Sequence, residues 1–463
     1  MLKKIILILA LICMIVLPIF GQTGNYTTSS NIVKCADYDH PDDAITAIGA
    51  SNKTLLVTES ETCNTNFNVP ANVKVRFERG GKLTINNGIT VTFNGQIDAG
   101  LWRIFSYTGT GTLAGTPLIS STYPQWWATG DGTVENPWAN DCIQKAYDFV
   151  PDGGTIYLKA GYYTLSDTIK TAKKISIIGE GRNKSIIVLD IAHGNGIGIV
   201  TDYCTLKGFT IDGDSQLDGT QYLSPISIIG CDYALLEDIE VKNAGYYGIN
   251  IYQVNHSLFQ NIYAHDNYRH GLHPGSDKTG RNKYNIYRDI YAWNNGVCGF
   301  KDRGNEINYD EECYNIYGNL KCWDNGLYGI MIGLQRAGVL SNSFASGNGG
   351  YGIYLKHIDD FNVHDCSTSL NDKEGLTIEH SNDVNITNVI VKNNNVLNAA
   401  NIGGIKVENS SRIKFTSCQS YDDRATKIQE YGIVTVGTSD FIEIINCILT
   451  PNEISSIYND AGQ

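Results

Sequence analysis

A short motif recurs through the second half of the chain: a glycine followed, with some lapses, by apolar residues at the next and the third position. It begins at Gly248, Gly271, Gly299, Gly329, Gly352, Gly375, Gly404 and Gly432, in steps of 23, 28, 30, 23, 23, 29 and 28 residues. A basal step of 23 residues with insertions is typical of a three-sided coil with variable loops. The repeat therefore predicts an all-β parallel solenoid.

Asparagines occur in register with this repeat. They lie four residues before consecutive glycines, at Asn267, Asn295, Asn325, Asn348 and Asn371. Amides at the same place on successive coils can hydrogen-bond along the stack and satisfy the backbone of a turn. Composition agrees, because 48 Gly and 28 Tyr beside only 10 Pro and 3 Met indicate strands and turns rather than helices.

The start of the chain resembles a targeting segment. Lys3 and Lys4 precede an almost wholly apolar run, and Gly21 offers a small residue for cleavage, so residues 1–21 are predicted to be a signal peptide. No later apolar stretch is long enough to span a bilayer. We therefore expect a secreted, extracellular protein without a membrane partner once the signal is removed. Its net charge of -13 argues against nucleic acid as a partner.

The mature chain divides into two predicted parts. Residues 22–122 are expected to form a small β-rich module, in which Cys35 and Cys63 are a plausible disulfide pair. Residues 123–463 are expected to form the solenoid. An amphipathic helix from Trp138 to Phe149 is predicted to cap its open end and to block strand addition there. The oligomeric state stays open.

The repeat also predicts which side chains face outward. In a strand that begins at each glycine, positions two and four residues later point away from the core. His273, Lys301 and Arg303 are thus expected to cluster on adjacent coils, with Tyr354 and Lys356 two coils further on. The inward row loses its apolar character at Pro274 and Asp302 in these same coils, and two long insertions, 277–285 and 304–312, follow them. Lapses in a local pattern gather at functional sites, although a solvated face bent by a proline is the alternative.

A basic cluster on an acidic protein suits a uronate polymer. Removal of the proton beside a hexuronate carboxylate needs cations to neutralise that carboxylate and a base to take the proton. Arg303 suits carboxylate pairing, His273 or Lys301 is the candidate base, and Tyr354 or Tyr309 is a candidate proton donor. The predicted reaction is either lyase elimination or epimerisation. His270, Asp302 and Lys356 are further predicted substrate contacts.

Two other function classes remain open. Hydrolysis would need two separated carboxylic acids, for which Asp302, Asp310, Glu311, Glu312, Asp359 and Asp360 are candidates. Such an acidic group is also compatible with Ca²⁺, although its spacing matches no calcium loop and no metal ligands or other cofactor are assigned. A noncatalytic solenoid that binds glycans is the third class.

The segment from Tyr123 to Gly181 resembles the entry to the pectate-lyase-like β-helix superfamily. The likeness is carried by Trp126-Trp127, Gly130-Asp131-Gly132, the predicted helix and the stretches 153–163 and 177–181. It implies a right-handed parallel β-helix, the fold that uronate lyases, polygalacturonases and phage tailspikes share. In repeat form the resemblance continues to the C-terminus, and it is specific for the fold rather than for the reaction.

A narrower resemblance lies in the stretch from His270 to Gly275. It is similar to the Tyr-Gly-Phe-Asp-Pro-His motif of mannuronan C5-epimerases, whose next coil carries an Asp before its glycine. Matched by position, the catalytic residues of that family fall on His270, His273, Gly275 and Cys298. None of those side chains is kept, so a changed reaction, a changed substrate and a loss of activity are all open.

Overall fold

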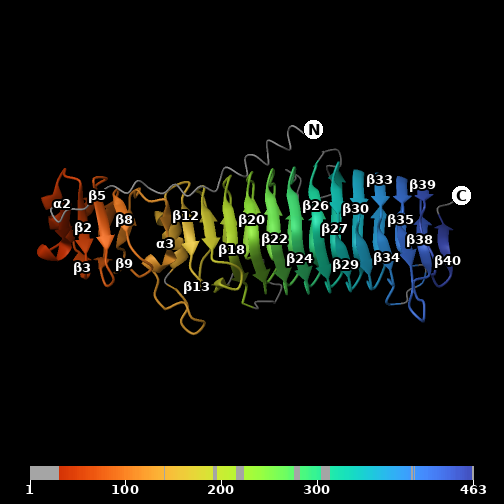
Figure 1. The fold of residues 1–463 in the computed structure, drawn as a ribbon, viewed down its shortest axis with the longest axis horizontal. Helices are drawn as coiled ribbons and strands as arrows, with labels where there is room; N and C mark the ends of the chain where they lie inside the picture. The colour runs from red at the N-terminus through yellow and green to blue at the C-terminus, as the bar shows by residue number, and fades with distance from the viewer. Residues whose placement is uncertain are drawn as a thin grey trace.

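The computed structural model describes residues 31–139, 141–190, 195–214, 224–275, 282–303, 313–397, 400 and 402–460. The expected signal peptide at 1–21 and the residues Tyr309, Asp310, Glu311 and Glu312 lie outside this part of the chain. The described chain forms an elongated stack of parallel strands that runs from the N-terminal to the C-terminal end (Figure 1). The predicted all-β parallel solenoid is therefore confirmed.

One face of the solenoid is built from the strands of the glycine repeat, each paired in parallel with the equivalent strand of the next coil. We call it the glycine face. Its strands are β14 (Ile169–Thr171), β17 (Ile197–Ile199), β19 (Ile226–Ile229), β21 (Ile249–Tyr252), β23 (His270–Gly275), β25 (Cys298–Arg303), β27 (Tyr328–Arg336), β30 (Tyr351–His364), β32 (Leu376–Glu379), β35 (Gly403–Glu408), β38 (Tyr431–Val436) and β40 (Ser455–Asp460).

The two other faces carry the remaining strands, several of which bend and serve both faces, and the last residues of β30, which pair with β28. These strands are β11 (Ser121–Thr122), β12 (Thr155–Leu158), β13 (Gly161–Leu165), β15 (Ser176–Gly179), β16 (Ser185–Leu189), β18 (Thr205–Asp212), β20 (Leu235–Lys242), β22 (Leu258–His265), β24 (Ile286–Trp293), β26 (Ile316–Trp323), β28 (Val339–Ser341), β29 (Phe344–Ser346), β31 (Ser367–Ser369), β33 (Asn382–Thr387), β34 (Ile390–Lys392), β36 (Ser411–Thr416), β37 (Gln419–Tyr421) and β39 (Asp440–Ile445). The bend inside β24 lies at Asp289 and that inside β26 at Asn319, with φ of 55° and 54°. Short polar side chains tolerate this left-handed backbone, and Asn319 Nδ2 donates to Asp289 Oδ1 at 2.6 Å.

The asparagine ladder forms as predicted. Asn267 Nδ2 donates to Asn295 Oδ1 at 2.8 Å, and the same bond links each later pair as far as Asn394. Each amide oxygen also accepts the backbone N–H of the preceding asparagine. Because the side chains are buried, these paired bonds offset the cost of placing amides in the interior.

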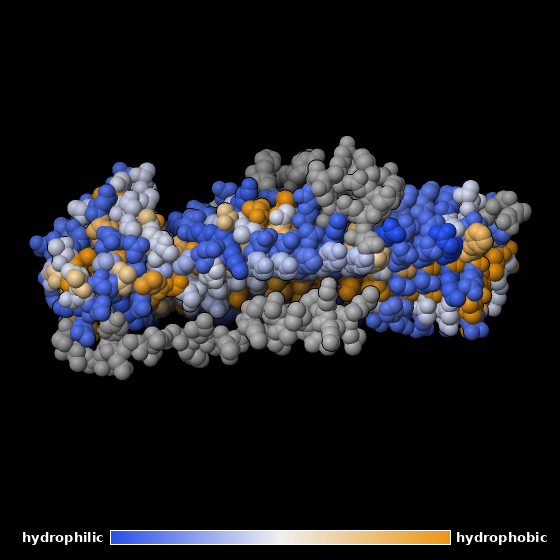
Figure 2. Space-filling model, turned by 90° about the horizontal axis from the view of Figure 1, so that it is seen from above, coloured by the Kyte–Doolittle hydropathy of each residue, from blue (hydrophilic) through white to orange (hydrophobic). Residues whose placement is uncertain are grey.

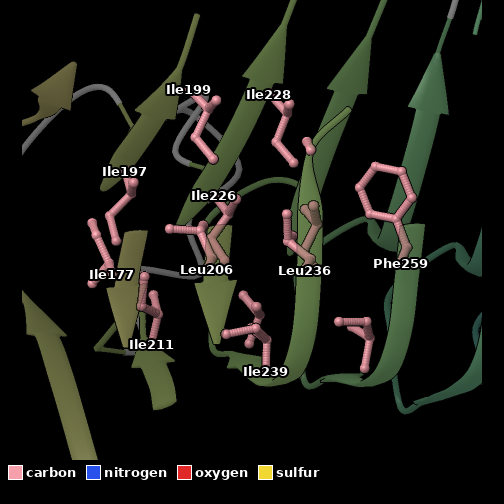
Figure 3. Packing of buried hydrophobic residues seen from close by; sticks show 14 of the residues in the cluster. Ile177, Ile197, Ile199, Leu206, Ile211, Ile226, Ile228, Leu236, Ile239 and Phe259 are labelled. Atoms are coloured by element: carbon pink, nitrogen blue, oxygen red, sulfur yellow. The ribbon is translucent and has the colours of Figure 1, made fainter. Parts of the chain in front are cut away.

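Inside the ladder of strands, aliphatic and aromatic side chains stack in rows. Ile197 lies beside Ile226, and Ile199 beside Ile228, one coil apart (Figure 3). The buried apolar residues form one contiguous cluster along the described chain. A solenoid has no large central core, so these stacked rows supply the apolar burial that stabilises it. The outer surface seen in Figure 2 is mainly hydrophilic, with hydrophobic side chains gathered along one edge toward the C-terminal end.

The N-terminal region is built from parallel strands as well. They are β1 (Ile32–Lys34), β2 (Lys53–Val57), β3 (Ser60–Cys63), β4 (Phe67–Val69), β5 (Val73–Phe77), β6 (Lys82–Ile85), β7 (Thr90–Phe93), β8 (Gln96–Asp98), β9 (Phe105–Tyr107) and β10 (Thr112–Ala114). They pair in three parallel sheets, with η2 (Cys35–Asp37) and α2 (Pro41–Ile48) near their start. The buried core continues across residues 122 and 123, and the division into two domains stays a prediction.

The predicted capping helix exists but does not end the stack. It is α3 (Cys142–Phe149), preceded by η3 (Pro124–Trp126), and coils lie on both sides of it (Figure 1). Phe149 packs edge-on against Phe93, Phe105 and Trp127, with ring centroids 6.1, 5.8 and 5.7 Å away. The helix therefore joins the N-terminal coils to the later ones, and its apolar side is buried between them rather than closing an open end.

The expected disulfide is not formed. Cys35 and Cys63 are both free thiols, buried in the N-terminal coils. Burial raises the pKa of each thiol to about 12, so both stay protonated. None of the helices in the described part of the chain has the length and apolarity that a membrane crossing requires.

Candidate functional site

The register of the glycine face places the predicted basic side chains together. Leu272 pairs with Phe300 and Gly275 with Arg303, so His273 lies beside Lys301 on the next coil. His273 Nδ1 is 3.3 Å from the backbone oxygen of Lys301. A carbonyl oxygen can only accept, so Nδ1 carries the proton and Nε2 keeps its lone pair. The side chains of His273, Lys301 and Arg303 are all partly exposed.

The residues that precede the repeat glycines complete the surroundings of His273. A Cβ on Gly271 would lie 2.6 Å from the Gly299 carbonyl oxygen, so the backbone there is too close for a larger residue. His270, just before this glycine, is buried with 1% of its surface exposed, whereas Tyr247, just before Gly248, is partly exposed. His270 stacks on Tyr247 with ring centroids 5.0 Å apart and meets His273 edge-on at 5.1 Å.

Lys301 connects the two histidines. Its Nζ is 3.3 Å from Nε2 of His270, while its backbone oxygen faces His273. Tyr247 lies edge-on to His273 at 4.3 Å and thus contacts both imidazoles. We call Tyr247, His270, His273, Lys301 and Arg303 the histidine–lysine cluster. It occupies neighbouring coils on one face, as the sequence predicts for its three basic members.

The cluster favours neutral imidazoles. Burial lowers the pKa of His273 to about 3, and the positive charge of Lys301 adds to the effect. Burial and Lys301 likewise hold the pKa of His270 well below its usual value. Burial lowers the pKa of the Lys301 ammonium, and Arg269 and Arg303 lower it further. At neutral pH both histidines are therefore proton acceptors in a positively charged setting.

Glycines on the same face make room for the cluster. A Cβ on Gly275 would lie 3.2 Å from Cε1 of His273, and one on Gly333 would lie 3.3 Å from Cγ of Arg303. Gly275 and Gly333 are the register partners of Arg303 on either side. The absence of side chains there leaves space for the imidazole and for the Arg303 stem.

Tyr354 and Lys356 form a different arrangement, two coils further on. The Tyr354 hydroxyl donates to the Glu379 carboxylate, and Lys356 Nζ is 2.6 Å from Glu379 Oε1. Burial alone would raise the pKa of Glu379, but the bonds from Lys356 and Tyr354 lower it. Both predicted substrate contacts are thus already matched to a carboxylate of the protein, in what we call the glutamate cluster.

The predicted role of Asp302 in substrate binding does not fit the structure. Its side chain points into the solenoid and is buried. Oδ2 accepts from the Tyr317 hydroxyl at 2.5 Å and Oδ1 accepts from Gln335 Nε2 at 3.2 Å. An interior hydroxyl and amide satisfy this carboxylate, so it is part of the core, and the hydrolase candidate that relied on it loses support.

Sequence reasoning missed Tyr247, Arg269 and Glu379. Arg269 Nη1 donates to the Tyr246 hydroxyl at 2.7 Å, and the Arg269 charge lowers the pKa of both cluster histidines. Tyr247 and Arg269 precede the repeat glycines, whereas the outward rows that the repeat predicts begin after them. The signal for Glu379 was its place in the same outward row as Lys356, one coil later.

Among residues 31–460, apart from the gaps given above, no group of three or more His, Cys, Asp or Glu side chains is placed to hold a metal ion. Asp310, Glu311 and Glu312 lie in one of those gaps. The calcium alternative therefore stays a prediction.

The described fold agrees with known proteins. Residues 175–389 and 318–463 match the family described as the right-handed β-helix region. Pectate lyase PEL9 of Emericella nidulans is 28% identical over 161 residues, 35% of this chain and 36% of that protein. The alignment thus spans about a third of that relative's length.

Two solved structures share the fold. The A-module of mannuronan C-5 epimerase AlgE4 from Azotobacter vinelandii has a TM-score of 0.55 at 17% identity, over 73% of this chain and 98% of that one. The Dettilon tailspike protein has a TM-score of 0.52 at 14% identity, over 73% of this chain and 68% of that one. At these identities the likeness concerns architecture.

Proposed function

We propose that this chain, which belongs to the right-handed β-helix family, acts on an acidic polysaccharide by removing the proton beside a hexuronate carboxylate. The observation that carries the proposal is the contact of Lys301 with two neutral histidines on one outer face, with Arg303 beside them. A protein with a net charge of -13 that gathers cations here is suited to an anionic ligand at this place. β-Elimination and C5-epimerisation share this first step and both remain within the proposal.

Recognition of the carboxylate is assigned to Arg303, with Lys301 and Arg269 adding positive charge. Arg303 presents a planar fork of donors that matches a carboxylate. As the proton leaves, negative charge spreads onto the carboxylate, and cations stabilise that charge more than they stabilise the ground state. The substrate would therefore bind where it is also activated.

His273 is the proposed base. Its Nδ1–H faces the Lys301 carbonyl, which leaves the Nε2 lone pair to accept a proton. An imidazole with a pKa of about 3 is a weak base in the free protein. Burial is the larger cause of this low pKa and Lys301 the next, so a bound substrate carboxylate would offset the Lys301 contribution and raise the pKa of His273 by that part.

Tyr247 is the proposed proton donor. Burial and the neighbouring Tyr246 raise its pKa, so it stays protonated, and its ring contacts both histidines. In an elimination it would protonate the leaving oxygen, and in an epimerisation it would return a proton to the opposite face of the sugar ring. Tyr354 is less suited because its hydroxyl is bonded to Glu379. Tyr309, the other predicted donor, lies outside the described residues.

The relatives support a polysaccharide substrate. PEL9 is a pectate lyase and the AlgE4 module belongs to a mannuronan epimerase, and both names denote action on uronate polymers. The positively charged start and the apolar run of the first residues support export to the outside of the cell, where acidic polysaccharides occur.

The test is incubation of the full chain with polygalacturonate, polymannuronate and alginate. A gain in ultraviolet absorbance would report the unsaturated product of elimination, and proton NMR would report a change of configuration at C5. His273→Ala should remove either signal, while His364→Ala, an exposed histidine beside Asp365, should leave it intact. Neither signal on any of these polymers would refute the proposal.

A noncatalytic glycan-binding role is the second candidate. The low pKa of His273 favours it, because the free protein lacks a base matched to neutral pH. This candidate predicts polymer binding without a change in the polymer. Binding would then persist in His273→Ala, and Arg303→Ala would weaken it.

A further inference from the structure

A second face of the solenoid carries two columns of stacked rings. In one column His265, Trp293 and Trp323 are register partners on successive coils, with centroids 4.1 and 5.1 Å apart. In the other, Tyr263 stacks on Tyr291 at 4.7 Å. These residues belong to β22, β24 and β26, whose second halves form a face separate from the glycine face.

Cations cover both ends of the tyrosine stack. The Arg182 guanidinium lies 3.4 Å from the Tyr263 ring centroid, and Lys321 Nζ lies 5.3 Å from that of Tyr291. His265, at one end of the tryptophan column, bonds to Glu240 and Asp266 through its ring nitrogens at 3.2 and 2.6 Å, so these contacts fix its edge rather than its face. The covered ring faces of the tyrosine stack stabilise it and have no area left for a ligand.

The outer side of Trp323 is different. Its register partner on the next coil is Ser346, followed by Ser369, and their hydroxyl oxygens are 3.0 Å apart. Adjacent strands lie about 4.8 Å apart, and the Trp323 indole extends further from the sheet than a serine side chain does. The ring stack therefore ends at Trp323 in a step of the surface, and the serine hydroxyls form the floor of that step. Phe344 lies two residues before Ser346, points the same way and borders the step. Among the described residues, Trp293 supplies the stacking contact of Trp323.

We infer that this step, which we call the Trp323 step, binds one hexuronate ring of the polysaccharide at a distance from the histidine–lysine cluster. The apolar C–H face of a pyranose fits an indole face, because its slightly positive hydrogens meet the negative π-face. The serine hydroxyls can exchange their mutual bond for bonds to sugar hydroxyls. Lys392, the register partner of Ser369, lies at the far end of this serine floor and is the cation assigned to a uronate carboxylate.

The inference rests on the proposed function for the identity of the sugar, but its site and its test are separate. A second contact on another face would hold a long polymer against the solenoid while the cluster acts on one residue. Binding of two segments of one chain raises the effective concentration of the second segment. The Trp323 step is thus expected to lower KM on polymers and to have little effect on short substrates.

The experiment is calorimetric titration of hexagalacturonate and hexamannuronate into the full-length His273→Ala chain, which would not consume the ligand. Ser346→Tyr is the decisive variant, because a tyrosine there would continue the ring stack and fill the step while Trp323 stays in place. We expect this variant to lose one binding site per chain without a loss of thermal stability. Ser341→Tyr, on a different face, is the matched control and should bind as the parent does.

The outcomes separate the two proposals. If only the proposed function fails, the parent still shows a site that Ser346→Tyr removes. If only the Trp323 step fails, Ser346→Tyr retains every site and the polymer KM, and the inference is overturned. Equal binding of neutral maltohexaose at the step would likewise overturn the assignment to a uronate.

Discussion

The histidine–lysine cluster and the glutamate cluster both place cationic side chains on the glycine face, and their surroundings differ. In the histidine–lysine cluster, Lys301 contacts His270, a neutral group, and lies beside His273. In the glutamate cluster, Lys356 is paired with the Glu379 carboxylate at 2.6 Å. On the same face, the charge of Lys356 is thus neutralised by a carboxylate, whereas Lys301 lies beside neutral imidazoles that can accept a proton.

This difference indicates where an anionic substrate would gain most. A carboxylate that binds near Lys356 must compete with Glu379, whereas one that binds near Lys301 meets cations whose like charges lower the Lys301 pKa. Binding there relieves repulsion as well as forming new contacts. A local excess of one charge, rather than the count of basic residues, distinguishes the proposed site from an ion-paired surface.

The largest expected effect comes from removal of the Lys301 charge. Lys301→Met keeps the backbone oxygen that orients His273 and should lower kcat/KM on the active polymer about 1000-fold. Lys356→Met should lower it less than about tenfold, because that charge is already matched. Steady-state assays of both purified variants make the comparison. Equal losses in the two variants would show that the two clusters do not differ in function.

His273→Asn should have the next largest effect. Asparagine can still donate to the Lys301 carbonyl but offers no basic nitrogen, so kcat should fall about 100-fold with a smaller change in KM. His364→Asn, which changes an exposed histidine on another face, is the control and should be neutral. A rise in KM without a fall in kcat would assign His273 to substrate binding instead of proton transfer.

Much of this arrangement could be predicted from the spacing of glycines and asparagines. The rows that contain His273, Lys301 and Arg303 follow from strand alternation, and the ladder from Asn267 onward follows from identical amides in register. Asn394 continues that ladder but was missed, because an insertion separates it from Gly404. Local pattern therefore predicts the scaffold wherever the step is regular.

The partners across coils were harder to predict. Tyr247 is partly exposed and stacks on His270, although strict alternation from the following glycine would have placed it inside. Asp302 was correctly placed inward, yet its role depends on Tyr317 and Gln335, which lie 15 and 33 residues away in sequence. Long-range hydrogen bonds of this kind leave no trace in a local pattern.

Acid should destabilise the folded chain through the histidine–lysine cluster. In the unfolded chain His273 takes a proton near its ordinary pKa of 6.5, whereas in the folded chain it stays neutral to about pH 3. Between these values the unfolded state binds more protons, so the free energy of unfolding falls as pH falls, by about 2 kcal/mol at pH 5 from this residue. His273→Asn should flatten the dependence of melting temperature on pH between 7 and 5. An unchanged slope would contradict the low pKa.

The smallest expected effect comes from the glutamate cluster. Glu379→Gln keeps hydrogen-bonding capacity toward Tyr354 but leaves the half-buried Lys356 without a counter-charge, which should cost about 1 kcal/mol of stability at pH 7. Because the pKa of Glu379 is lowered in the folded chain, the pair stabilises the parent above the unfolded pKa and loses this effect as pH falls through the folded value. Denaturant unfolding should thus show a larger difference between parent and variant at pH 7 than at pH 3. Glu379→Gln also makes the glutamate cluster resemble the histidine–lysine cluster, because Lys356 loses the carboxylate that neutralises its charge. If weak binding of oligouronates then appears that Lys356→Met abolishes, unmatched charge is sufficient for binding, and the histidines are needed only for the chemical step.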